Sequence, residues 1–203
     1  MSAIRHLTMT NLTTNNLRAT VVKAAVVAVA AGIIPVTVAT GSDAAASIPA
    51  AATCSTTWGS LAKSSATMVA GPVANVRAGR NTCYDRLVID VKGRAPGFSV
   101  RYVSEVTTEG RGATVPLRGG ASLLVVVRAP ADTSSGAPSY TPVNRREVVN
   151  VAGFSTFRQV AWAGTFEGQT SLGVGVRARL PFRVFTIQDA ATSRLVIDVA
   201  HRW

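Results

Sequence analysis

The segment Arg86-Leu87-Val88-Ile89-Asp90-Val91 indicates the fold most clearly, and it recurs as Arg194-Leu195-Val196-Ile197-Asp198-Val199. In each copy Leu, Ile and Val occupy alternate positions and share one face of a predicted strand. Arg, Val and Asp share the other face. An acidic residue is unusual in the middle of a strand, so its repetition predicts a structural role for both copies. The alternative is chance similarity between two common strand sequences.

Two arrangements of the copies are open. In the first they are antiparallel neighbours with Val88 opposite Val196, so that Arg86 faces Asp198 and Asp90 faces Arg194; opposite charges across such a pair are stabilising. A parallel arrangement would oppose like charges. In the second, the copies lie in different sheets related by an internal pseudo-repeat and do not touch. In both, we expect Leu87, Ile89 and Val91, with Leu195, Ile197 and Val199, to face one shared core.

The rest of the chain from residue 54 onward also has the pattern of short strands. Breakers rich in Gly, Pro, Ser and Asn separate most of the apolar runs. This spacing predicts an all-β fold, a β-sandwich of two mainly antiparallel sheets. The predicted strands are 84–92, 98–106, 121–128, 147–151, 157–164, 170–179, 181–187 and 194–200.

The composition is that of a folded protein. Hydrophobic residues make up 47% of the 203 residues and charged residues 15%, which is too apolar for a disordered chain. The length suits one domain with appendages. The formal charge is +11, but the excess of arginine resembles a coding bias and is weak support for any partner.

Residues 1–39 have the pattern of a secretory signal peptide. Arg5, Arg18 and Lys23 precede the apolar run 24–39, which small residues follow. We expect cleavage after Ala39 or Ala46, a linker over 40–53 and one domain over 54–203. Met9 is an alternative start, and a retained membrane anchor is the alternative to cleavage. The predicted product is secreted, has no stable membrane span and carries a charge of +8, because the first 39 residues hold three basic and no acidic residues.

The chain has two cysteines, Cys54 and Cys83, and both follow the predicted signal. A pair of cysteines in an exported chain predicts a disulfide. The alternative is that Cys54 carries a lipid anchor, but Ala-Ala-Thr before it lacks the large aliphatic residue typical of such a site.

Several separated segments resemble, in order, the AMIN-like domain of exported actinobacterial proteins. They are 83–91, 115–120, 154–160 and 194–199, with Cys54 and 58–60 at the front edge. This family is similar to the amidase N-terminal (AMIN) domain. The resemblance implies an envelope module of two β-sheets, and AMIN domains of cell-wall amidases and secretins bind peptidoglycan. The sequence shows no amidase, secretin or other catalytic domain that such a module would deliver to the cell wall, so a simple targeting role is not expected.

Catalytic motifs are missing from the sequence. After the predicted signal the only histidine is His201, which we expect at a frayed end, and this leaves little for Ser-His-Asp or metal catalysis. Asp90 and Asp198 could form a pair of catalytic carboxylates, but their strand sequences favour structural pairing with Arg86 and Arg194. We therefore predict a protein that is not an enzyme and needs no metal or cofactor.

One predicted hairpin suggests a binding face. If Glu167-Gly168 is a two-residue turn, Trp162 lies opposite Gly173, Val160 opposite Gly175 and Arg158 opposite Arg177. Trp162 then either covers bare glycines, which is a structural role, or forms a platform for sugars or peptides that bear carboxylates. The residues predicted to bind are Arg158, Trp162, Phe166, Arg177 and Arg179.

The predicted export of the chain indicates which anionic partner a basic domain would meet. Nucleic acid is not expected outside the cytosol, whereas an exported basic domain meets an anionic cell surface. We predict a secreted, cell-wall-associated module that binds an anionic polymer such as peptidoglycan. The alternatives are a structural or protein-interaction domain that uses a sheet edge to join an envelope protein, and a small hydrolase or ligand carrier.

Overall fold

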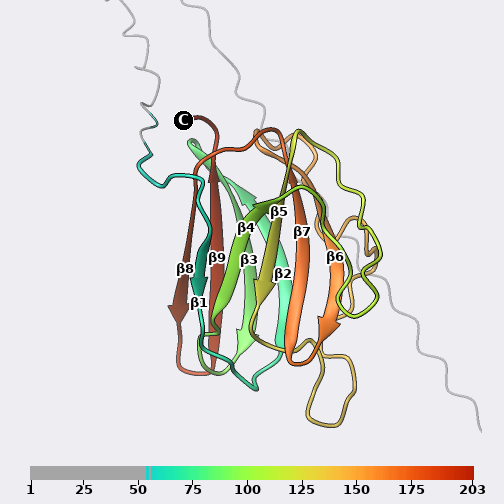
Figure 1. Cartoon of the computed structure of the whole chain (residues 1–203). Coiled ribbons are helices and arrows are strands. Elements are labelled where there is room, and N and C mark those ends of the chain that lie inside the picture. Colours follow the sequence, from blue (N-terminus) through green and yellow to red (C-terminus); the bar gives the residue numbers. More distant parts are fainter. Residues whose placement is uncertain (1–53, 55) are drawn as a thin grey trace, which may run out of the picture. The chain divides into compact units, whose positions relative to one another are not determined.

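The computed structural model describes residue 54 and residues 56–203, and within them the fold is an all-β sandwich, as predicted (Figure 1). The predicted signal peptide, its cleavage sites and the linker lie outside the described residues. The five-stranded sheet has the order β1-β4-β5-β7-β6, with β1 Lys63–Ser65, β4 Phe98–Val103, β5 Ala121–Val127, β7 Gln169–Val176 and β6 Phe157–Phe166. The four-stranded sheet has the order β2-β3-β9-β8, with β2 Val73–Arg80, β3 Tyr84–Lys92, β9 Thr192–Ala200 and β8 Phe182–Gln188.

The two copies of the repeated segment lie at the centre of the four-stranded sheet. β3 and β9 pair antiparallel with Val88 opposite Val196 and Arg86 opposite Asp198. This confirms the first of the two predicted arrangements and excludes the separation of the copies into different sheets. All six apolar residues predicted for the inner face are at most 1% exposed: Leu87, Ile89, Val91, Leu195, Ile197 and Val199.

The inner faces of both sheets form one hydrophobic core. Leu123, Val125 and Val127 of β5 and Leu172 and Val174 of β7 belong to the same cluster as the apolar triplets of β3 and β9. Alternating side chains of two stacked sheets interdigitate in this way in sandwiches.

Three predictions about strands need correction. The segment 147–151 is a loop, although Val148 donates a backbone hydrogen bond to Val160. The strands β1 and β2 were not predicted. β1 has only three residues, and β2 has a register irregularity between Val73 and Asn75 that breaks the period of two on which a strand prediction rests.

Long loops cover one side of the sandwich. The connections after β4 and β5 lie beside β6 (Figure 1), and Trp162 of β6 donates a backbone hydrogen bond to Arg145 in the second of them. No helix in the described part of the chain is long and apolar enough to cross a membrane.

Candidate binding site

The predicted hairpin exists, but its register differs from the prediction. Phe166 pairs with Gln169 around Glu167 and Gly168, which both have positive φ, as a two-residue turn requires. A register shift between Trp162 and Gly164 then inserts one extra residue into β6. Trp162 therefore lies opposite Leu172, and the prediction that it faces Gly173 is wrong. Counted from the turn, one extra residue exchanges the two faces of all residues beyond it, which here are the residues that precede Gly164 in the chain.

This exchange buries Trp162. Its exposed fraction is 7%, it belongs to the hydrophobic core, and its ring lies 5.6 Å from that of Tyr140. Gly173 faces Leu117 and Gly175 faces the Arg118 backbone, so the loop before β5 covers these glycines in place of Trp162. Trp162 is part of the core and cannot act as an exposed stacking platform.

The predicted arginines each bond to a different part of the backbone. Arg158 lies at a second register shift and donates to the carbonyl oxygens of Phe154 and Phe157, so it does not oppose Arg177 as predicted. Arg177 donates to the carbonyl oxygen of His201 near the chain end. Phe166 is 50% exposed beside the hairpin turn. Of the five residues predicted to bind, Arg179 alone lines the cavity described next.

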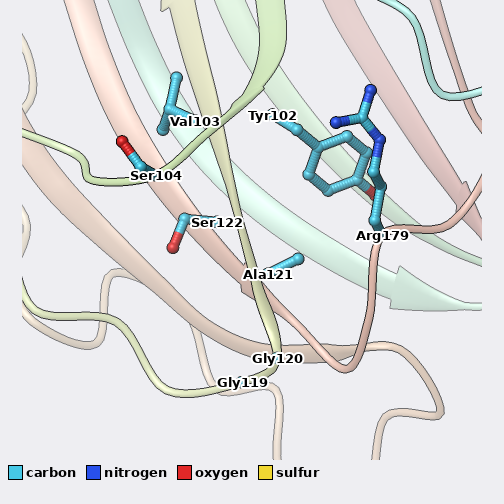
Figure 2. A pocket seen from close by; sticks show the side chains of 8 residues that line it. All are labelled: Tyr102, Val103, Ser104, Gly119, Gly120, Ala121, Ser122 and Arg179. Carbon is cyan, nitrogen blue, oxygen red and sulfur yellow. The ribbon is translucent and has the colours of Figure 1, made fainter.

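This cavity lies where β4 ends and β5 begins, and its volume is about 510 Å³. Figure 2 shows the Arg179 guanidinium beside the Tyr102 ring on one side, with the hydroxyls of Ser104 and Ser122 on the other. The complete lining is Tyr102, Val103, Ser104, Gly119, Gly120, Ala121, Ser122 and Arg179.

Arg179 is held in place by contacts on two sides. Its guanidinium carbon lies 5.2 Å from the centre of the Tyr102 ring, a cation–π distance. Its Nε donates to Ser60 Oγ at 3.1 Å and its Nη2 to the Ser60 carbonyl at 3.2 Å. The Trp203 indole donates to the Arg179 carbonyl at 3.1 Å. Among the described residues Nη1 makes no hydrogen bond, so one donor group is available to a ligand.

Tyr102 connects the cavity to the core. Its hydroxyl donates to the Leu180 carbonyl at 2.8 Å and accepts from the Leu180 N–H at 3.0 Å. Its ring packs edge-on against Phe182 at 5.7 Å. Burial raises the pKa of Tyr102 above its ordinary value, because the phenolate is poorly solvated there. The ring thus presents a neutral aromatic surface to the cavity.

The cavity chemistry suits binding. Arg179 supplies a cation that can grip a carboxylate or phosphate, Tyr102 supplies a ring, and the two serines supply hydroxyls that donate and accept hydrogen bonds. The lining has no carboxylate, imidazole or thiol, so these residues offer no general base near neutral pH.

Two of the four residues predicted to be structural, Arg86 and Asp198, form an ion pair on the outer face of the four-stranded sheet. Asp198 is fully buried, and Arg86 donates to both of its carboxylate oxygens, at 2.6 and 2.9 Å. These hydrogen bonds raise the pKa of Arg86. Arg183 donates to Asp198 at 2.8 Å and stacks 4.4 Å from the centre of the Trp58 ring.

The second predicted ion pair does not form. Asp90 lies opposite Arg194 in register, but it accepts two hydrogen bonds from Arg77 instead, and Arg194 pairs with Asp189. β2 lies on the other side of β3 and brings Arg77 opposite Val88, within reach of Asp90.

Sequence reasoning missed one buried carboxylate. Asp85 is fully buried and accepts from the N–H groups of Thr156 and Phe157, and its other oxygen lies 3.1 Å from His201 Nε2. The signal was present, because Asp85 is in phase with Leu87 and therefore on the inner face of β3. The expectation that His201 lies on a frayed end is thus wrong. The nearby Thr156 hydroxyl donates to the Ala200 carbonyl, so these residues do not form a catalytic triad.

The fold is an all-β sandwich that carries a polar cavity beside its five-stranded sheet. The family model of the AMIN-like domain matches residues 71–201, and the chain belongs to this family. Membership indicates a non-catalytic module related to the cell wall. Among the curated proteins no relative matches the chain. In the described part of the chain no group of three or more His, Cys, Asp or Glu could hold a metal ion.

Proposed function

We propose that this protein is an exported, non-catalytic module of the cell envelope that binds an anionic wall polymer in the cavity of Arg179 and Tyr102. The observation that carries the proposal is the pairing of a fixed guanidinium with an aromatic ring, 5.2 Å apart, at the rim of a polar cavity. A sugar can stack on the ring while its carboxylate binds the guanidinium.

Family, covalent structure and charge support this proposal. The AMIN-like family is related to the cell wall, and the Cys54–Cys83 disulfide fits an oxidising compartment outside the cytosol. The charge of +8 that follows residue 39 attracts the domain to an anionic surface. Peptidoglycan, whose peptides end in carboxylates, is the polymer with which we would begin.

The test is cosedimentation of the protein with purified, insoluble cell wall. Arg179→Gln removes the cavity cation and should lower the fraction bound at least about tenfold at low salt. Arg101→Gln is the matched control, because Arg101 lies on the same strand as Tyr102, is exposed and does not line the cavity. It makes the same change in net charge and should bind almost as well as the wild type.

Salt separates specific from diffuse binding. Attraction through net charge fades as the screening length falls well below about 10 Å, whereas stacking on Tyr102 persists. Failure of the wild type to sediment with any cell wall would reject the function. Equal losses in Arg179→Gln and Arg101→Gln would reject the cavity as the site and leave only charge-driven adsorption.

A further inference from the structure

The four-stranded sheet has an open edge at β8. Phe182 at its start donates its N–H away from β9, to the Gly59 carbonyl at 2.9 Å. Backbone groups alternate in direction along an antiparallel strand, so Val184, Thr186 and Gln188 also direct their N–H and C=O outward. Within the described residues these outward groups have no backbone partner.

The other edges of the sandwich are protected. Loop residues 145 and 148 make backbone hydrogen bonds to β6, and β1 is only three residues long. On β2, Val73 donates to Pro130, the Asn75 side chain accepts from Val76 N–H, and a register irregularity follows Val73. Such covering, short strands and irregularities are the usual ways in which proteins prevent edge pairing. Among the described edge strands, β8 is the long one that has no covering loop along most of its length and no register irregularity.

The sequence of β8 also favours pairing. Phe182-Arg-Val-Phe-Thr-Ile-Gln188 has no Lys, Pro or acidic residue, and aromatic and β-branched residues dominate it. The one charged residue of β8 is Arg183. The Nε of Arg183 donates to Asp198, and the terminal nitrogens of this guanidinium make no hydrogen bond among the described residues.

We propose that β8 pairs antiparallel with β8 of a second copy of this chain, with Thr186 on the two-fold axis. The two four-stranded sheets then join into one continuous sheet. Because the interface is isologous, each contact occurs twice and the assembly closes as a dimer. This inference is independent of the proposed wall binding.

The register follows from the open groups. With Thr186 opposite the partner's Thr186, Val184 pairs with the partner's Gln188, so all three outward residues find partners. A shift of the axis to Phe185 would bring Gln188 against the partner's Phe182, whose N–H already bonds to Gly59. The Thr186 register therefore satisfies the open edge without breaking an existing hydrogen bond.

The side chains are complementary in this register. Phe185 lies opposite the partner's Ile187, an aromatic and β-branched pair, and the two threonines face each other; both kinds of pair stabilise sheets. Arg183 lies opposite the partner's Asp189. That carboxylate already pairs with Arg194 of its own chain, but it is 45% exposed, so its solvent-facing side is open to the terminal nitrogens of Arg183.

The first test is the mass of the full chain by sedimentation velocity over about a hundredfold range of concentration. We expect the mass to double at the upper end. Thr186→Pro removes an outward N–H without removing a bond to β9, and should weaken association at least about tenfold. Thr186→Val keeps the N–H and the strand propensity, and should dimerise as the wild type does.

The second test fixes the register and does not depend on proline. Directly opposed residues of a hydrogen-bonded pair have Cα atoms about 5.5 Å apart, which is within disulfide range. Thr186→Cys should therefore cross-link two chains under mild oxidation, whereas Gln188→Cys, opposite the partner's Val184, should not. A wild type that stays monomeric at every concentration overturns the proposal. This holds even if the monomer binds an added foreign peptide along β8, because the edge would then serve a different partner. So does a dimer that Thr186→Pro leaves intact.

Discussion

Asp90 and Asp198 occupy the same position in two copies of one hexapeptide, yet they differ in environment. Asp198 is completely buried between two guanidinium groups, whereas the side chain of Asp90 is 22% exposed and pairs with an Arg77 side chain that is 50% exposed. Position in the sheet makes this difference, because β9 lies between β3 and β8 and receives an arginine from each side.

These twin positions provide a controlled comparison. Asp198→Ala leaves two arginines facing a cavity without their carboxylate and should lower the free energy of unfolding by about 3 kcal/mol. Asp90→Ala breaks a partly solvated pair and should cost at most about 1 kcal/mol. Urea denaturation of both variants measures the difference. Equal losses would show that burial of Asp198 does not set its contribution.

Tyr102 gives a prediction in alkaline solution. Its pKa is raised in the folded state, so above its unfolded value, about 10, the unfolded chain loses this proton first. Stability from this group is present below that pH and is lost as pH rises through the folded pKa. In Tyr102→Phe this loss should disappear, while stability at neutral pH falls by about 1 kcal/mol because the hydrogen bonds to Leu180 are absent.

Thermal unfolding from pH 8 to pH 12, with wild type and variant side by side, measures this effect. The difference between the two proteins isolates Tyr102 from other groups that titrate in this range, such as Lys63, whose pKa burial lowers. A stability difference that does not change with pH would contradict the assignment.

At the scale of elements, the glycines of β7 allow the loop before β5 to lie against the five-stranded sheet. A Cβ on Gly175 would be 2.0 Å from the Arg118 carbonyl oxygen, which is backbone. A Cβ on Gly173 would meet only side-chain atoms of Leu117 and Val106, at 3.0 and 3.1 Å. Backbone is less able to move aside than the ends of side chains.

Substitution by alanine should separate the two sites. Gly175→Ala forces the loop away from the sheet and should cost about 3 kcal/mol, whereas Gly173→Ala should cost about 1 kcal/mol as Leu117 shifts. Chemical denaturation measures both. If Gly173→Ala is the more damaging substitution, side-chain packing of Leu117 holds the loop more firmly than its backbone does.

At the scale of the whole molecule, a disulfide fastens the segment that precedes β1. The predicted bond between Cys54 and Cys83 is confirmed, with Cα atoms 5.2 Å apart. It holds this segment near the start of β3, where Trp58 packs edge-on against Tyr84 at 5.7 Å and stacks with Arg183. The described residues before β1 thus become part of the sandwich surface.

Removal of the bond should weaken the whole fold. It closes a loop with a sequence separation of 29 residues, so Cys54→Ser with Cys83→Ser should lose roughly 3–4 kcal/mol in the chain-entropy model. Thermal unfolding of this variant and of the wild type with and without reductant measures the loss. The reduced wild type should match the variant, and an unchanged stability after reduction would refute the entropic contribution.

Much of the fold follows from the sequence alone. A period of two in the repeated segment predicted the inner faces of β3 and β9, because this pattern acts locally along a strand. The opposite charges at the ends of the segment favoured an antiparallel register if the copies were neighbours, but they left open a separation of the copies into two sheets. The Glu167-Gly168 turn was predicted for the same reason, since positive φ at both central positions is a local requirement. The cysteines were predicted to pair because two of them follow a predicted export signal.

The tertiary structure decided the site. One extra residue near Gly164 moved Trp162 from the outer face into the core. Gly164 is a local sign of such an insertion, but a glycine within a strand does not by itself fix whether a residue is inserted. The cavity combines Tyr102 of β4 with Arg179 of the loop after β7, and Ser60 from before β1 fixes that arginine. Asp90 likewise pairs with Arg77, and not with Arg194, only because β2 lies beside β3. Contacts between residues far apart in sequence depend on which strands become neighbours, and the packing of the complete sandwich sets that order.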